Sequence, residues 1–283
     1  MTIKVVGIVG AGTMGSGIAQ TVAVAGLQTV LVDVTDSALD KGVKALTGSL
    51  DRFVAKGTLD AVTRDAALAR IEASIDYQRL SRCDLVIEAA TESTELKVRL
   101  LKQIESVVRS DAIIASNTSS ISITALGAAL AAPSRFIGMH FFNPVPLLPL
   151  VEVINGIQTC SDTAEAVRQL TLQLGKSPIV VKNSPGFVVN RVLVPMINEA
   201  FFALADGVAT AEEIDTGMRL GANHPIGPLA LADLIGLDVC LSVMDVFLHD
   251  FGDPKYRASP LLRELVAAGR LGRKSRRGVY NYD

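Results

Sequence analysis

Apolar residues at the start of the chain follow two different periods in succession. A continuous apolar run rich in β-branched residues covers residues 5–9, and between residues 18 and 27 apolar positions recur at steps of three and four. An unbroken apolar run indicates a buried strand, while steps of three and four indicate an amphipathic helix. Between the two patterns lie Gly10, Gly12 and Gly15. We therefore expect a strand that leads through a glycine-rich turn into a helix.

Strand and helix patterns go on alternating as far as residue 181. They predict helices over 36–56, 58–70, 95–108 and 161–174, and strands over 29–32, 71–75, 84–88, 112–115, 135–139, 150–154 and 178–181. Asp36 or Ser37 is expected to begin the first of these helices, because short polar side chains cap helix N-termini. Strands that alternate with helices are typical of a parallel sheet covered on both faces. The predicted fold is therefore α/β, with a doubly wound, Rossmann-like sheet.

The strand patterns disappear after the turn Asn183-Ser184-Pro185-Gly186. Beyond it, apolar spacing predicts helices over 187–206, 211–219, 229–235, 237–250 and 260–268, with glycine and proline in the turns between them. We therefore expect two domains, an α/β domain over residues 1–184 and an all-α domain over residues 185–283.

The glycine-rich turn matches the pattern G-x-G-x-x-G. Its glycines allow a tight turn, a close approach of the backbone to a pyrophosphate and close packing of helix on strand. The next predicted strand ends at Asp33, about 20 residues further along, where a carboxylate accepts a hydrogen bond from a ribose 2′-hydroxyl. A 2′-phosphate would instead be repelled by that charge. The pattern therefore predicts a dinucleotide site that prefers NAD to NADP.

A histidine and a glutamate stand out in the next part of the chain. The strand over 135–139 leads to His140 and a proline-containing loop, and Glu152 lies among branched apolar residues of the strand over 150–154. A histidine among apolar neighbours is also compatible with a core position. A buried carboxylate, however, needs a partner, and a carboxylate that orients an imidazole forms a general base. We expect the two side chains to meet.

Composition and charge narrow the class of protein. The chain has 283 residues, of which 49% are hydrophobic and 20% charged, and its net charge is −2. These values are typical of a globular protein and give no general attraction to nucleic acid or to acidic membranes. The most apolar window, 186–206, contains charged and amide side chains that exclude a membrane span. No basic leader precedes the first strand, so we expect a cytoplasmic protein.

The cysteines and the histidines show no spacing that is typical of a metal site. Cys83, Cys160 and Cys240 lie far apart and form no C-x-x-C pair, so we expect reduced thiols and no bound metal.

Three polar groups allow two interpretations each. The run over 116–120 is either a loop with a helix cap or a set of ligand contacts at a strand end. Ser49 and Lys56, two helical turns apart, are either solvated or part of a binding surface. The basic segment over 270–277 is either a solvated tail or a phosphate-contacting segment that folds back on the active site.

Taken together, these residues resemble the L-3-hydroxyacyl-CoA dehydrogenase family over essentially the whole chain, and most of all its short bacterial members that act on 3-hydroxybutyryl-CoA. The specific motifs are Ser116-Asn117-Thr118-Ser119-Ser120, His140-Phe141-Phe142-Asn143-Pro144, Pro185-Gly186-Phe187-Val188-Val189-Asn190-Arg191 and Gly221-Ala222-Asn223-His224-Pro225. One position departs from the family pattern, because Pro149 stands where lysine or a small residue is expected; this bears on local loop geometry.

The resemblance implies an NAD-dependent oxidoreductase that interconverts a 3-hydroxyacyl-CoA and a 3-ketoacyl-CoA. It makes His140 the general base, Glu152 the residue that orients it, and Ser119 and Asn190 the polar groups at the substrate. Ser49 and Lys56 match positions that contact CoA. The positions that match cofactor contacts are Gly10, Ala11, Gly12, Thr13, Met14, Gly15, Asp33, Glu92, Lys97, Ser119, Asn143 and Lys274.

The resemblance also implies that the helical domain closes the acyl-CoA site and forms a homodimer. Two other functions share this scaffold. One is a dehydrogenase of free sugar acids, as in the L-gulonate branch, against which Ser49 and Lys56 argue. The other is a non-catalytic structural protein, as in lambda-crystallin, against which the presence of both His140 and Glu152 argues.

Overall fold

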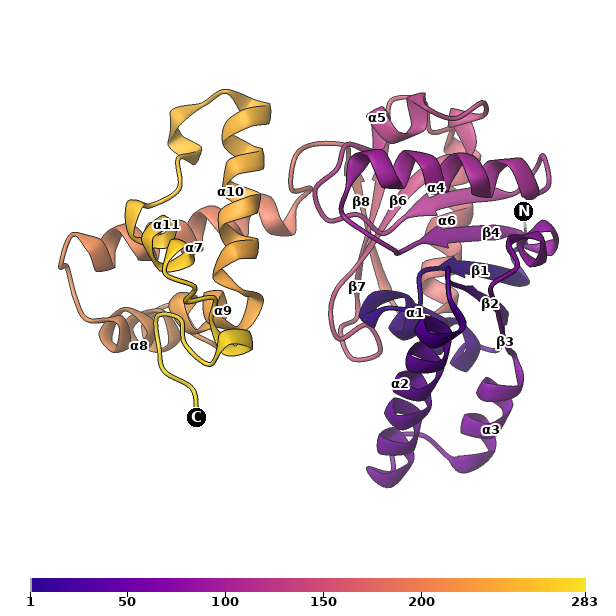
Figure 1. Ribbon diagram of the computed structural model, residues 1–283, viewed down its shortest axis with the longest axis horizontal. Helices are drawn as coiled ribbons and strands as arrows, with labels where there is room; N and C mark the ends of the chain where they lie inside the picture. Colours follow the sequence, from indigo (N-terminus) through magenta and orange to yellow (C-terminus); the bar gives the residue numbers. More distant parts are fainter. Residues whose placement is uncertain (1) are drawn as a thin grey trace. The chain divides into compact units, whose positions relative to one another are not determined.

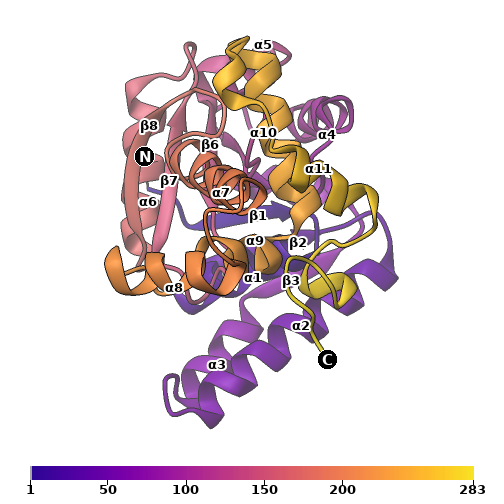
Figure 2. The ribbon, with the colours of Figure 1, turned by 90° about the vertical axis from the view of Figure 1, so that its left-hand side faces the viewer.

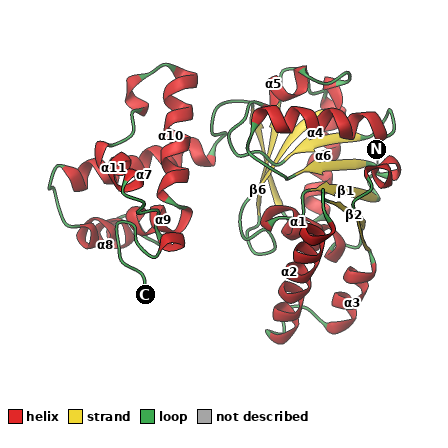
Figure 3. Ribbon diagram, viewed as in Figure 1, coloured by secondary structure: helices red, strands yellow, loops and turns green. Residues whose placement is uncertain are grey.

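The computed structural model describes residues 2–283. The chain divides into two compact units, Met1–Ser184 and Pro185–Asp283, which Figure 1 shows in colours that follow the sequence. Among the described residues 2–283, strands occur only in the first unit, and the second contains helices and loops (Figure 3). The predicted fold class, an α/β sheet domain followed by an all-α part, is confirmed.

Eight strands form one sheet in the first unit, in the order β3-β2-β1-β4-β5-β6-β7-β8. They are β1 (Val5–Val9), β2 (Gln28–Val32), β3 (Ile71–Ser74), β4 (Leu85–Glu88), β5 (Ile113–Ser116), β6 (Phe136–Phe141), β7 (Leu150–Asn155) and β8 (Ser177–Lys182). Each predicted strand is present, with ends that differ by at most about two residues, the usual uncertainty of such boundaries.

The sheet is not parallel throughout, because β7 runs antiparallel to β6. The other neighbouring strands are parallel. A parallel neighbour requires a long crossover, usually a helix, whereas β6 and β7 are joined only by the loop over residues 142–149. The direct connection therefore reverses the chain, and the predicted doubly wound sheet is present with this one antiparallel pair.

Six α-helices accompany the sheet. They are α1 (Thr13–Val24), α2 (Asp36–Ala55), α3 (Ala61–Ala69), α4 (Thr94–Val107), α5 (Ile123–Ala128) and α6 (Ser161–Gln173), with 3₁₀ turns η1 (Tyr77–Arg82) and η2 (Pro133–Arg135). The predicted helices are confirmed, with two corrections at their starts. Thr35, not Asp36 or Ser37, caps α2. Asp60 caps α3, which therefore begins at Ala61 and not at residue 58 as predicted. The sequence did not predict α5, which is too short to show a period.

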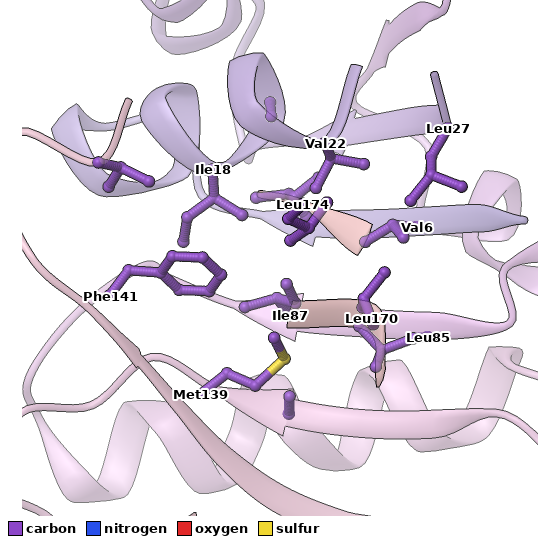
Figure 4. Close-up of a cluster of buried hydrophobic side chains, with 14 of the residues drawn as sticks. Val6, Ile18, Val22, Leu27, Leu85, Ile87, Met139, Phe141, Leu170 and Leu174 are labelled. Carbon is purple, nitrogen blue, oxygen red and sulfur yellow. The ribbon is translucent and has the colours of Figure 1, made fainter. Parts of the chain in front are cut away.

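The main core lies between the sheet and the helices on one of its faces. Side chains of α1 and α6, such as Ile18 and Leu170, pack against strand residues such as Val6 and Ile87 (Figure 4). Each such side chain contributes about 1.5–3 kcal/mol when fully buried. On the sheet's other face lie α4 and α5 (Figure 1). The strands are therefore covered on both sides, which leaves their ends as the accessible part.

Two helices of the first unit project beyond the sheet. α2 and α3 contact each other and α1, and they extend away from the strands as a helical hairpin (Figures 1 and 2). Gly42 lets α2 approach the turn before α1, because a Cβ at this position would lie 2.5 Å from the carbonyl oxygen of Ala11. The hairpin is thereby attached to the glycine-rich turn.

The second unit has its own core. Its elements are α7 (Val189–Ala205), α8 (Ala211–Gly221), α9 (Pro228–Ile235), α10 (Leu237–Phe251) and α11 (Pro260–Ala267), with 3₁₀ turns η3 (Pro254–Tyr256) and η4 (Arg273–Ser275). Phe201, Leu229 and Phe247 are fully buried at the centre of this unit. All five predicted helices are confirmed, within about two residues at each end.

The chain beyond the basic C-terminal segment is attached to the helical unit. Buried Asp233 accepts hydrogen bonds from the backbone N–H groups of Val279 and Tyr280, both at 2.9 Å. The hydroxyl of Tyr280 in turn donates to Asp215 at 2.8 Å. These contacts fix the end of the chain to α8 and α9, while the basic side chains of Arg273, Lys274, Arg276 and Arg277 remain exposed. No spacing in the sequence identified these aspartates as partners of the C-terminus.

The cysteines are free thiols, and in the described part of the chain no helix is long and apolar enough to cross a membrane. Burial raises the pKa of Cys83 and of Cys240 to about 12. Cys160 is exposed, and a hydrogen bond from the Thr163 hydroxyl lowers its pKa. Within residues 2–283, no group of three or more His, Cys, Asp or Glu side chains is arranged to hold a metal ion.

Lys176 is a buried cation that holds the loop between β6 and β7. Its ammonium donates to the carbonyl oxygens of Val145 at 2.6 Å and of Leu148 at 2.8 Å. Lys176→Met should lower the free energy of unfolding by about 1–3 kcal/mol, because it leaves the buried carbonyl of Val145 and the partly buried carbonyl of Leu148 without this donor. Burial lowers the pKa of this amine, so the unfolded chain holds the proton more strongly.

Raising the pH towards the ordinary lysine value of 10.5 therefore stabilises the folded wild type, and the cost of Lys176→Met should grow with pH. Denaturant unfolding at several pH values between neutrality and that value measures both effects. Exposed Lys102 on α4 provides the control, since Lys102→Met should change stability little. Equal costs for the two substitutions would contradict the prediction.

Candidate active site

The glycine-rich turn lies between the end of β1 and the start of α1. Gly10 has a φ of +106°, which favours glycine, and a Cβ at Gly15 would lie 1.7 Å from the carbonyl oxygen of Gly10. A Cβ at Gly12 would meet no atom within 4 Å, so the backbone there faces open space. The three glycines thus form a tight turn with one open side at a helix N-terminus, which fits the pyrophosphate of a dinucleotide.

Asp33 follows directly after β2, at the sheet edge where the prediction expects it. Its Oδ2 accepts a hydrogen bond from the N–H of Ala11 and its Oδ1 one from the N–H of Val34, both at 2.6 Å. The carboxylate therefore braces the glycine-rich turn, which the sequence did not predict. Its acceptor oxygens also lie beside that turn, where a ribose would follow the pyrophosphate.

A cavity of about 360 Å³ opens beside the turn. Its walls come from the turn, from α2 and from the loop after β6, and they include Gly12, Thr13, Ser49 and Asn143. With Ala11, which also lines it, five residues predicted to bind ligand are thereby brought to one cavity. Lys56 is the C-cap of α2 and lies exposed at the end of the helix.

Lys97, which the resemblance places among the cofactor positions, is buried. Its side chain is 2% exposed, and its Nζ lies 2.7 Å from Oε2 of Glu88, whose side chain is 0% exposed. A lysine is rarely buried without a paired charge, and Glu88 supplies it. The ammonium is therefore held inside the protein, at the end of β4.

Glu92 and Ser119, both predicted to lie at the cofactor, contact each other. Glu92 Oε1 accepts hydrogen bonds from the N–H of Ser119 at 2.5 Å and from its Oγ at 2.7 Å. Thr118 donates to the same oxygen at 3.2 Å. The polar run over 116–120 thus makes several contacts beyond its own loop.

His140 and Glu152 lie directly opposite each other on β6 and β7. The Nδ1 of His140 is 2.7 Å from Oε2 of Glu152, and the residues are 6% and 0% exposed. The predicted contact is present, although His140 belongs to β6 and does not follow it. A carboxylate at Nδ1 favours the tautomer with its proton there, which leaves the Nε2 lone pair for proton transfer.

Asn117 is a residue that the sequence did not single out by itself. Its Oδ1 accepts a hydrogen bond of 2.9 Å from the N–H of Phe141, the residue after His140. The end of β5 is thereby tied to the strand that carries the histidine. In the sequence, the only signal for Asn117 was its position in the polar run over 116–120, close to Ser119.

The two remaining predicted residues belong to the helical unit. Asn190 is the second residue of α7. Lys274 lies in η4, and its Nζ is 2.5 Å from Oδ1 of Asp238.

A glycine-rich turn between strand and helix, with an acidic residue at the end of the next strand, is the arrangement of an NAD-binding Rossmann domain. The family model described as the NAD binding domain of 3-hydroxyacyl-CoA dehydrogenase matches residues 5–184, and the model of its C-terminal domain matches residues 186–282. The protein is therefore an NAD-dependent dehydrogenase.

The chain belongs to the 3-hydroxyacyl-CoA dehydrogenase family. It is 50% identical to a 3-hydroxybutyryl-CoA dehydrogenase of Bradyrhizobium diazoefficiens over 280 residues, which cover 99% of this chain and 96% of the relative. It is 42% identical to a 3-hydroxyadipyl-CoA dehydrogenase of Escherichia coli, covering 100% of this chain and 60% of that protein. The crystal structure of an (S)-3-hydroxybutyryl-CoA dehydrogenase from Ralstonia eutropha is similar with a TM-score of 0.98 and 61% identity, and each chain is covered completely.

Proposed function

We propose that this protein interconverts (S)-3-hydroxybutyryl-CoA and acetoacetyl-CoA, with His140 as the general base. The observation that supports the role of His140 is its 2.7 Å contact with Glu152 in buried surroundings. A carboxylate that cannot be solvated stabilises a positive charge on its neighbour, so the pair suits an imidazole that gains and loses a proton.

In the oxidative direction, Nε2 of His140 takes the proton of the substrate's 3-hydroxyl. Glu152 stabilises the imidazolium formed and keeps the ring in one orientation. NAD, when bound, accepts the hydride from C3. In the reductive direction the protonated His140 returns its proton to the oxygen at C3. Ser119 and Asn190 contribute polar contacts to the substrate.

The remaining predicted residues divide between the two ligands. NAD is held by residues 10–15, Asp33, Glu92, Asn143 and Lys274, and by the buried Lys97 through its contact with Glu92. CoA is contacted by Ser49 and Lys56. In this proposal residues 1–184 form the NAD-binding domain and residues 185–283 the substrate and dimerisation domain of a cytoplasmic homodimer. The match of the two family domains to the two units supports this division.

The substrate is tested by kinetics with 3-ketoacyl-CoA thioesters from four carbons upward, a carboxylate-ended thioester and a free sugar acid. We expect the highest kcat/KM with acetoacetyl-CoA. Lys56→Ala should raise KM for acetoacetyl-CoA while KM for NADH hardly changes, because an exposed cation on α2 contacts only the CoA. Lys44→Ala, an exposed lysine on the same helix, is the matched control. Preference for the free acid, or equal changes in both KM values, would contradict the proposal.

The cofactor preference is expected to depend on Asp33. The wild type should favour NADH, and Asp33→Asn should reduce the ratio of kcat/KM for NADH to that for NADPH by roughly 10- to 100-fold, the value of a charge-assisted hydrogen bond. Asparagine keeps one oxygen, which can accept the N–H of Ala11 and retain the brace of the turn, but it loses the bond from the N–H of Val34; thermal unfolding of the variant checks that the fold is intact. Asp40→Asn on the exposed side of α2 is the control. A wild type that uses both cofactors equally would refute this role.

A further inference from the structure

Glu88 is a fully buried carboxylate to which the proposed mechanism gives no task. It lies at the end of β4 and receives four hydrogen bonds. Oε1 accepts from the N–H of Ala90 at 2.8 Å and from Nζ of Lys97 at 2.9 Å, and Oε2 accepts from Lys97 at 2.7 Å and from Ser116 Oγ at 2.7 Å. The position of Glu88 is therefore fixed from several directions.

Stability alone does not account for this ion pair. Removing two charges from water costs several kcal/mol per ion, and well-packed apolar residues commonly serve as well at such a place. A buried pair at the carboxyl ends of the strands, where ligands bind in open α/β sheets, is instead suited to holding a charge in one position.

A chain of polar contacts leads from Glu88 to Ser119. The Nζ of Lys97 lies 3.6 Å from Oε2 of Glu92, and Oε1 of Glu92 accepts from the N–H and the Oγ of Ser119. We propose that Glu88 is a positioning residue, which acts through Lys97 and Glu92 to fix the side chain of Ser119 in the reaction. This inference rests on the proposed function, in which Ser119 contacts the substrate.

The physical reason lies in competition for Glu92. Its side chain is 45% exposed, so its own packing does not fix it. Lys97 pairs mainly with Glu88, at 2.7 Å, and its ammonium stays 3.6 Å from Glu92. Oε1 of Glu92 therefore remains available to accept the hydrogen bonds from Ser119. Without the charge on Glu88, Lys97 pairs with Glu92 alone and draws that carboxylate away from Ser119. A displacement of about 1 Å at a reacting centre costs up to about 100-fold in rate.

The test is a double-mutant cycle measured as kcat/KM for acetoacetyl-CoA with NADH. We expect Glu88→Gln to lower kcat/KM by about 10- to 100-fold. In the background of Ser119→Ala the same substitution should cost less than about threefold, because its effect passes through the missing hydroxyl. Glu72→Gln is the matched control, since Glu72 pairs with Arg79 and Arg82 on the far edge of the sheet and should leave kcat/KM unchanged.

A second variant guards against loss of folding, because Glu88→Gln leaves a buried lysine without its main partner. Glu88→Gln/Lys97→Met removes both charges, so no ammonium remains to draw Glu92 away from Ser119, and we expect this variant to recover most of the kcat/KM that Glu88→Gln loses. A loss from Glu88→Gln that multiplies with the loss from Ser119→Ala, or a double variant that stays as slow as Glu88→Gln, would overturn the inference and make the pair merely structural. A wild type without turnover of acetoacetyl-CoA would instead overturn the proposed function.

Discussion

His140→Gln should lower kcat about 10²- to 10⁴-fold, the usual contribution of a positioned general acid or base. Glutamine has a similar size and keeps a hydrogen-bonding group beside Glu152, but it does not exchange a proton near neutral pH. Steady-state kinetics with acetoacetyl-CoA and NADH measures the loss. Affinity for NADH should survive, because the glycine-rich turn belongs to β1 and α1 and not to the strand that carries His140.

His249→Gln makes the same chemical change at an exposed position on α10, where the Nδ1 of the histidine lies 2.8 Å from Oδ1 of Asp250. We expect this control to keep the kcat of the wild type. A folded His140→Gln protein that binds NADH and retains wild-type turnover would refute the proposed mechanism outright.

Glu152→Gln is the second substitution with a large expected effect. A neutral amide no longer stabilises the imidazolium, and its NH₂ group can face Nδ1 and reverse the tautomer of His140. A fall in kcat of about 10²- to 10⁴-fold is expected, with little change in KM for NADH. The control is Glu165→Gln, a substitution on the exposed face of α6 that removes the ion pair between Glu165 and Arg168.

The double variant His140→Gln/Glu152→Gln shows whether the two residues act as one unit. If Glu152 works only through His140, the double variant should be little worse than the worse single variant. Fully multiplicative losses would mean that Glu152 serves the reaction by another route. Folding of all three variants is checked by thermal unfolding, since an uncompensated buried carboxylate in His140→Gln costs stability.

Local patterns predicted most elements of the fold. The apolar run of β1 and the helical spacing in α1 are properties of neighbouring residues, so they are readable without the rest of the chain. The contact between His140 and Glu152 was also predictable, because a carboxylate among apolar strand residues demands a partner and His140, 12 residues earlier, comes at the end of the preceding predicted strand.

Other features depend on contacts that leave no mark on the sequence. The burial of Lys97 depends on Glu88, nine residues earlier on another element, and both look like ordinary charged residues in a sequence. The brace from Asp33 to Ala11 and the bond from Asn117 to Phe141 likewise join separate elements. A specific hydrogen bond of this kind has no period, so pattern analysis cannot detect it.

The antiparallel pairing of β6 and β7 makes the position of His140 and Glu152 independent of the loop that joins the two strands. The backbone ladder itself sets His140 opposite Glu152, so the chemistry does not depend on the length of the connecting loop. That loop, residues 142–149, also supplies Asn143 and Pro146 to the cavity beside the glycine-rich turn. Directed evolution of ligand preference can therefore vary the loop in composition and length while the proposed proton-transfer pair, His140 and Glu152, is inherited unchanged.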